Sequence, residues 1–79
     1  MDEKINILLF GVLAEKFNTN SLKFDKVIDT DTLMTHLKSQ YIFLEEINFS
    51  IAVNKKMIHE NTYLKNNDDV ALMPPFSGG

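Results

Sequence analysis

The segment KINILLF at residues 4–10 alternates as a β-strand does, and the rest of the fold is built around it. Ile5, Ile7 and Leu9 fall on one face, because successive side chains of a strand point to opposite sides of a sheet. The other face begins polar and becomes apolar toward Phe10. The segment therefore predicts a strand that is buried along one face and partly apolar on the other.

Further short segments of the chain are typical of strands, and turn residues separate them. They lie at residues 21–25, 49–53, 57–58 and 70–73. Residues 54–56 supply a turn, and Pro74 ends the last strand because proline has no N–H to donate to a sheet. The sequence therefore predicts a sheet of four to five strands.

One amphipathic helix is expected at residues 32–40, between the second and third strands. Its apolar positions recur at helical spacing, at Leu33, Met34, Leu37 and Tyr41. Thr30 or Asp31 is expected to cap this helix, because a short oxygen side chain satisfies free N–H groups of the first turn. A shorter helical turn is expected at residues 12–17.

The resulting order of elements is an α+β pattern, a mixed sheet with one main helix packed on one face. If the first and last strands pair in parallel at the centre, the chain folds as a ubiquitin-like β-grasp. We expect one globular domain at residues 1–74 and a flexible C-terminal tail at residues 75–79, which ends in Gly-Gly. A chain of 79 residues leaves room for no second domain.

Composition excludes several classes of function. The net charge is −3, from 8 Lys, no Arg and 11 acidic residues, which argues against nucleic acid as a partner. The absence of cysteine excludes disulfides, thiolate metal sites and a cysteine nucleophile. No segment has the length of a membrane span or the features of a signal peptide, so we expect a cytoplasmic protein without membrane contact.

The residues that carry chemistry elsewhere do not form a motif here. His36 and His59 are too far apart for metal-ligand spacing, so no metal site is expected. The acidic pairs Glu45-Glu46 and Asp68-Asp69 are neighbours whose side chains diverge, and we interpret both pairs as solvated loops. Lys55-Lys56 is interpreted as a turn rather than as a phosphate site. We therefore expect no catalytic pocket in the domain itself.

The unusual feature is the ending Met73-Pro74-Pro75-Phe76-Ser77-Gly78-Gly79. A frayed end is the ordinary interpretation of a terminus. Such an end seldom carries an aromatic residue after two prolines, however. A Gly-Gly ending also has a specific use, because without Cβ atoms it can enter a narrow channel and present its carboxylate to another protein.

Taken with the order of elements, this ending resembles a known family. The strand end Ile51-Ala52-Val53-Asn54, the turn Asn67-Asp68-Asp69-Val70 and the Pro-Pro-x-x-Gly-Gly ending are similar to the small, sulfur-carrying subunits of molybdopterin synthase. These are the MoaD type of the MoaD/ThiS ubiquitin-like family, and the resemblance covers residues 5–79. Asn67 stands where a turn glycine is common in the family, and asparagine tolerates the same left-handed conformation.

The resemblance implies a role in molybdenum cofactor biosynthesis for the carboxylate of Gly79. An E1-like enzyme would use ATP to form a glycyl adenylate, and a sulfur-donating enzyme would convert it to a thiocarboxylate (1-thioglycine). The large synthase subunit would then pass the sulfur to cyclic pyranopterin monophosphate, which forms the dithiolene. On this view the chain is a non-catalytic subunit of a sulfurtransferase and binds no cofactor itself.

The resemblance also implies the surfaces that partners contact. The tail residues Pro75, Phe76, Ser77 and Gly78 would enter the large subunit, in a heterotetramer of two small and two large subunits. Phe10, Met57, Met73 and Phe76 match apolar interface positions of the family. Met57 and Met73 have a second interpretation, as side chains that pack at the edge of the core.

Three other functions remain open on the sequence. The chain can be a sulfur carrier of the thiamine pathway, which shares the fold and the Gly-Gly end. It can be a ubiquitin-like modifier that forms isopeptide bonds to lysines. It can also be a β-grasp interaction domain with an inert tail.

Overall fold

The computed structural model describes residues 3–75 of the chain. Its elements, in chain order, are β1 (Lys4–Leu9), α1 (Val12–Phe17), β2 (Ser21–Asp25), α2 (Thr30–Gln40), the 3-10 helix η1 (Ile42–Glu46), β3 (Ser50–Val53), β4 (Lys56–Ile58) and β5 (Asp69–Met73). Every predicted strand and both predicted helices are present, with ends displaced by at most two residues. The predicted boundary between residues 74 and 75 lies at the limit of the described chain and stays a prediction.

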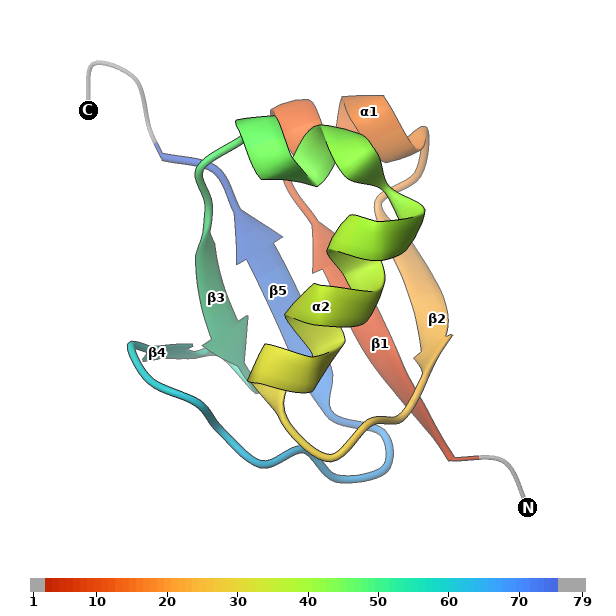
Figure 1. The fold of residues 1–79 in the computed structure, drawn as a ribbon, viewed down its shortest axis with the longest axis vertical. Coiled ribbons are helices and arrows are strands. Elements are labelled where there is room, and N and C mark those ends of the chain that lie inside the picture. Colours follow the sequence, from red (N-terminus) through yellow and green to blue (C-terminus); the bar gives the residue numbers. More distant parts are fainter. Residues whose placement is uncertain (1–2, 76–79) are drawn as a thin grey trace.

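The five strands form one sheet in the order β2-β1-β5-β3-β4. The two central strands β1 and β5 are parallel, with Ile7 opposite Val70, and each of the other pairs is antiparallel. Helix α2 crosses one face of this sheet (Figure 1). The predicted β-grasp arrangement, with the first and last strands side by side, is therefore confirmed.

The core lies between α2 and the sheet. Ile5, Ile7 and Leu9 of β1 are at most 2% exposed, as their alternation predicts. The rest of the buried cluster comes from every layer of the fold and comprises Leu13, Leu33, Leu37, Leu44, Val53, Leu64, Val70 and Leu72. None of the helices within residues 3–75 covers the opposite face of the sheet (Figure 1), which is called the open face below.

The start of α2 differs from the prediction. The N-cap is Asp29, rather than Thr30 or Asp31, and its Oδ1 accepts a hydrogen bond of 2.9 Å from the Thr32 N–H. Its Oδ2 accepts a second bond, of 3.1 Å, from the Asn61 side chain. Thr30 is buried instead, where its hydroxyl accepts from the Thr62 N–H at 3.0 Å. Three successive residues with capping side chains compete here, and contacts with residues 61–62 decide among them.

The sequence did not predict η1, which follows α2 directly. Its residue Leu44 is buried, and Phe43 completes a cluster of three aromatic rings with Phe17 and Tyr41. The ring centroids of Phe17 and Tyr41 are 4.5 Å apart. This cluster joins the end of α1 to the end of α2.

Within residues 3–75, three turns use the left-handed conformation at residues other than glycine: one at Asn18 after α1, one at Asn54 and Lys55, and one at Asn67. Asn54 and Lys55 have φ of 51° and 72°, the pattern of a two-residue hairpin between β3 and β4. The turn is therefore one residue shorter than predicted, because Lys56 already pairs with Val53. Asn67 has φ of 71°, so the expected left-handed conformation at this position is confirmed.

Candidate functional site

The open face of the sheet carries an apolar row that runs across four strands. Strand register places Leu8 beside Ala71, Ala71 beside Ala52, and Ala52 beside Met57. Adjacent strands are about 4.8 Å apart, so the row spans roughly 14 Å. Leu8, Ala71 and Ala52 face away from α2, because their neighbours Leu9, Val70 and Val53 face it. Ala52 is itself buried, and Met57 pairs with it on the edge strand β4, where Met57 also lines a hollow beside α2.

Phe10 and Met73 extend the row at the end of the sheet where β1 and β5 finish. Each follows the last registered pair of the two parallel strands, Leu9 and Leu72, by one residue. Met73 lies inside β5 and therefore points to the open face, and Phe10 lies at the corresponding position just beyond the end of β1. Phe10 is 48% exposed and Met57 is 46% exposed. We define the apolar patch as Leu8, Phe10, Ala52, Met57, Ala71 and Met73.

The second interpretation of Met57 and Met73, as core packing, does not fit this arrangement. Neither side chain belongs to the buried cluster, nor to the partly buried residues that pack against it. Phe10, Met57 and Met73 thus lie in the same half of the sheet, and their role as an interface stays a prediction. Leu8, Ala52 and Ala71 belong to the same surface and were not predicted. The apolar end of the KINILLF segment was the available signal for Leu8.

The other end of the open face is polar and internally bonded. The Lys23 ammonium donates to the Asn6 side-chain oxygen at 2.9 Å, and the Asn6 amide donates to the Asp69 carboxylate at 2.9 Å. Lys4 forms an ion pair with Asp25 on the same face. The face is therefore divided, with its apolar half beside the end of β5 and its polar half beside the start of that strand.

The tail leaves the fold at the apolar half of this face. Met73 is the last residue of β5, and Pro74 follows it against Gly11. Phe76, Ser77, Gly78 and Gly79 lie outside the described residues, so their predicted roles stay predictions. Pro75 is exposed at the end of the described chain. The parallel strands β1 and β5 end at the same edge of the sheet (Figure 1).

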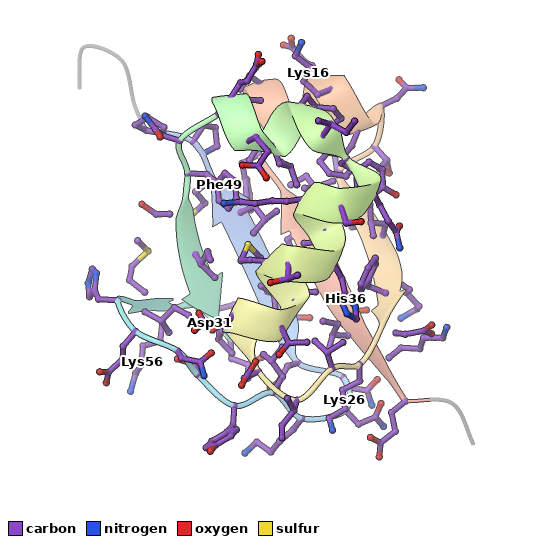
Figure 2. The ribbon with its side chains drawn as sticks, viewed as in Figure 1. Lys16, Lys26, Asp31, His36, Phe49 and Lys56 are labelled. Atoms are coloured by element: carbon purple, nitrogen blue, oxygen red, sulfur yellow. The ribbon has the colours of Figure 1, made fainter. Side chains whose placement is uncertain are left out.

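The remaining polar candidates do not assemble into a reactive site. His36 lies on the β2 side of α2, whereas Asp31 and Phe49 lie on its β3 side (Figure 2). Within residues 3–75, no three His, Asp or Glu side chains come together as a metal site. Asp68 corrects one prediction, because its carboxylate is not solvated. It is 7% exposed and accepts hydrogen bonds from Asn54 and from the Lys65 N–H.

A hollow of about 350 Å³ lies beside the apolar patch, between the start of α2 and the β3–β4 hairpin. Met34, Phe49 and Met57 give it apolar walls, and Asp31, His59 and Glu60 are at its rim. Among the described helices, none is long and apolar enough to cross a membrane.

The order of the strands and the helix on one face define a ubiquitin-like β-grasp protein, with an apolar open face next to its C-terminal exit. The chain belongs to the ThiS family, whose model matches residues 7–79. The family membership expected from the sequence is thereby confirmed.

Individual relatives agree with this placement. The molybdopterin synthase sulfur carrier subunit of Dictyostelium discoideum is 30% identical over 87 aligned residues, which cover 100% of both chains. Among solved structures, the small archaeal modifier protein 1 of Methanosarcina acetivorans has a TM-score of 0.82 at 22% identity and covers 100% of this chain and 99% of its own. Subunits 1 and 2 of the molybdopterin-converting factor of Helicobacter pylori form a solved complex. A chain of that complex has a TM-score of 0.73 at 26% identity, over 96% of this chain and 99% of its own.

Proposed function

We propose that this protein is the sulfur carrier subunit of a molybdopterin synthase. The observation that carries the proposal is the full-length match to a sulfur carrier subunit, at 30% identity with no part of either chain left over. The Gly78-Gly79 ending supports it, because the sequence offers no other group suited to carrying sulfur.

The chemistry would take place at the carboxylate of Gly79. A carboxylate is a poor electrophile, because its charge repels nucleophiles and oxide is a poor leaving group. A partner enzyme would transfer the AMP of ATP to the carboxylate, with release of pyrophosphate. Sulfide-level sulfur would then displace AMP and leave a C-terminal thiocarboxylate. The sulfur would then form a C–S bond to a carbon of the pterin substrate while a C–O bond at that carbon breaks and its oxygen leaves. Water would cleave the resulting thioester, which leaves the sulfur on the substrate as a thiol and regenerates the carboxylate.

The apolar patch would bind the large subunit. Its position beside the exit of the tail is the arrangement that such binding requires, since docking of the patch places the tail at the partner's surface. Residues 75–79, extended at about 3.3 Å each, reach roughly 16 Å, so the carboxylate can enter a buried site while the domain stays outside. The catalytic groups would belong to the large subunit, and this chain would supply sulfur and contact area.

Intact-protein mass spectrometry tests the proposal directly. The purified protein is incubated with ATP, the E1-like enzyme of the same organism and a sulfur donor. The expected product is heavier by the difference between one sulfur and one oxygen, and it returns to the original mass when the large subunit and cyclic pyranopterin monophosphate are added. Isopeptide adducts on lysines in place of this cycle would instead identify a protein modifier. A protein that is never charged would refute the proposal.

A further inference from the structure

The contact between Gly11 and Pro74 lies where the tail leaves the fold. β1 ends at Leu9, so Gly11 is the second residue after this strand, and Pro74 is the first residue after β5. Since β1 and β5 are parallel with Leu9 opposite Leu72, Gly11 and Pro74 occupy corresponding positions two residues further along. A Cβ atom at residue 11 would lie 3.2 Å from the Cγ and 3.9 Å from the Cδ of Pro74.

The backbone of Gly11 has a conformation that suits glycine alone. Its φ is 57° and its ψ is −133°, a region in which the Cβ of an L-residue is strongly disfavoured. The conformation turns the chain at once from β1 into α1, where the Gly11 carbonyl accepts from the Glu15 N–H at 3.3 Å. Leu13 of α1 is fully buried. Gly11 is therefore fixed in place, because β1 precedes it and the buried Leu13 of α1 follows it.

Pro74 has little freedom of its own. Met73 before it is paired with Ser50 in the sheet, and the ring fixes φ near −65°. Pro75 restricts Pro74 further, because a residue before proline is limited to extended conformations. Gly11 lies close to the ring, so it limits movement of the ring itself, while rotation about ψ is already limited by Pro75. The direction in which the chain continues from Pro74 is therefore set by the fold.

A small rotation at Pro74 has a large effect at the end of the tail. The remaining residues form an arm of roughly 16 Å when extended, so a turn of about 10° displaces the end by about 3 Å. Misplacement of reacting atoms by about 1 Å can cost a hundredfold in rate. A tail that leaves the domain in the right direction also loses less conformational entropy on insertion into a partner.

We propose that Gly11 is a positioning residue for sulfur transfer, acting through the Pro74 ring to direct the C-terminal tail into the large subunit. This inference rests on the proposed function. It assigns a functional role to a residue that belongs neither to the tail nor to the apolar patch. Gly11→Ala would push the ring away, and it would also strain the turn into α1.

A double-mutant cycle separates these two effects. The variants are Gly11→Ala, Pro74→Ala and the double variant, with Asn67→Ala as a control. Asn67 also has a positive φ, 71°, but it precedes the opposite end of β5. Each variant is charged with sulfur, and the single-turnover rate of transfer is measured at saturating large subunit. The affinity for that subunit and the free energy of unfolding are measured in parallel.

Each single substitution at the contact is expected to lower the transfer rate tenfold or more and to change the affinity less than threefold. In the Pro74→Ala background, Gly11→Ala should lower the rate less than twofold further, because the ring is already gone. Gly11→Ala should lower the free energy of unfolding by a similar amount with and without Pro74→Ala, because backbone strain at Gly11 does not depend on the proline ring. Asn67→Ala should lower stability and leave the rate unchanged.

Three results would overturn the inference. One is an unchanged transfer rate in Pro74→Ala, which can be measured even if Gly11→Ala does not fold. Another is an equal rate loss from Gly11→Ala in both backgrounds, which would assign the effect to strain. The third is a rate loss in Asn67→Ala as large as that in Gly11→Ala. A wild-type protein that cannot be charged at all would instead refute the proposed function, and with it this inference.

Discussion

The side-chain amide of Asn54 donates a hydrogen bond of 2.9 Å to the carboxylate of Asp68, which joins the β3–β4 hairpin to the turn that leads into β5. The Asn54 side-chain oxygen also accepts from the Asp69 N–H at 2.9 Å, and the Asn54 N–H donates to the Asp69 carbonyl at 2.8 Å. Asn54, which has the left-handed conformation, thus fixes the start of β5 through three hydrogen bonds. This explains why Asp68 is buried in a protein this small.

Replacement of Asn54 by alanine should destabilise the domain by about 2–3 kcal/mol. Two side-chain hydrogen bonds are lost, at about 1 kcal/mol each, and alanine at φ of 51° adds roughly 1 kcal/mol of strain. Urea unfolding measures the change as a lower midpoint with an unchanged slope. A loss below about 0.5 kcal/mol would show that the Asn54–Asp68 bond has little weight in the fold.

At the neighbouring residue, Lys55, we expect a substitution to stabilise the domain instead. Its φ is 72°, and glycine is the preferred second residue of this two-residue hairpin. We expect Lys55→Gly to stabilise the domain by about 0.5 kcal/mol, because relief of strain outweighs the added entropy of the unfolded chain. Lys55→Ala is the matched control. It also removes the charge but keeps the Cβ atom, so it should not stabilise, and equal gains in both variants would contradict the explanation.

The apolar patch predicts a selective loss of partner binding. Burial of a side chain such as Phe10 is worth about 1.5–3 kcal/mol, so Phe10→Asp should weaken binding to the large subunit at least tenfold. Ile42→Asp is the control, because Ile42 is 73% exposed on η1, outside the patch. Isothermal titration calorimetry should give nearly wild-type affinity for this control. Equal losses in both variants would place the interface elsewhere.

The helix cap predicts a specific dependence of stability on pH. Hydrogen bonds from the Thr32 side chain, the Asn61 amide and the Thr32 backbone N–H hold the pKa of Asp29 below its ordinary value of 3.8. A lowered pKa in the folded state stabilises the protein fully above the unfolded value, and this contribution disappears as the pH falls through the folded value. The stability advantage of wild type over Asp29→Asn should therefore hold near neutrality and shrink below about pH 4.

Asp31→Asn is the control for that measurement. Asp31 lies in the same first turn, and its side chain accepts none of the hydrogen bonds that cap α2. Chemical unfolding at several pH values should give a nearly constant difference for this variant. A wild-type advantage over Asp29→Asn that grows as the pH falls would contradict the assigned direction of the shift.

The ending of the chain predicts a strict requirement for the position of the carboxylate. Deletion of Gly79 or addition of one residue after it moves the carboxylate by about 3.3 Å, and Gly78→Val adds a branched side chain where a narrow channel should admit none. Each change should abolish sulfur loading in the intact-mass assay. The melting temperature should stay at the wild-type value. A lengthened protein that still gains the sulfur mass would exclude a terminal thiocarboxylate.

The strands were predictable because burial on one face imposes alternation on the sequence. Ile5, Ile7 and Leu9 display it, and the structure buries all three. The 3-10 helix at Ile42–Glu46 was not predictable, because five residues with one buried position show no period. The cap of α2 was ambiguous, since only contacts with the distant Asn61 and Thr62 decide between Asp29 and the next two residues.

The candidate surface was predictable only in part, for a related reason. Exposed apolar residues such as Phe10 and Met57 can be found in the sequence, but the pairing of strands decides which of them meet. Ala52 and Ala71 join the patch solely through their register with Met57 and Leu8. The approach of Gly11 to Pro74 depends on the same register, across more than sixty intervening residues.

The parallel pairing of β1 with β5 also has a consequence for synthesis of the protein. The middle of the sheet consists of the first and the last strand of the chain, so no subset of earlier elements contains a complete sheet. A ribosome must therefore release nearly the whole polypeptide before the domain can close, and a product truncated before residue 69 lacks the strand that links the two halves. Only a chain that has been synthesised through β5 can therefore form the apolar patch beside the exit of the tail.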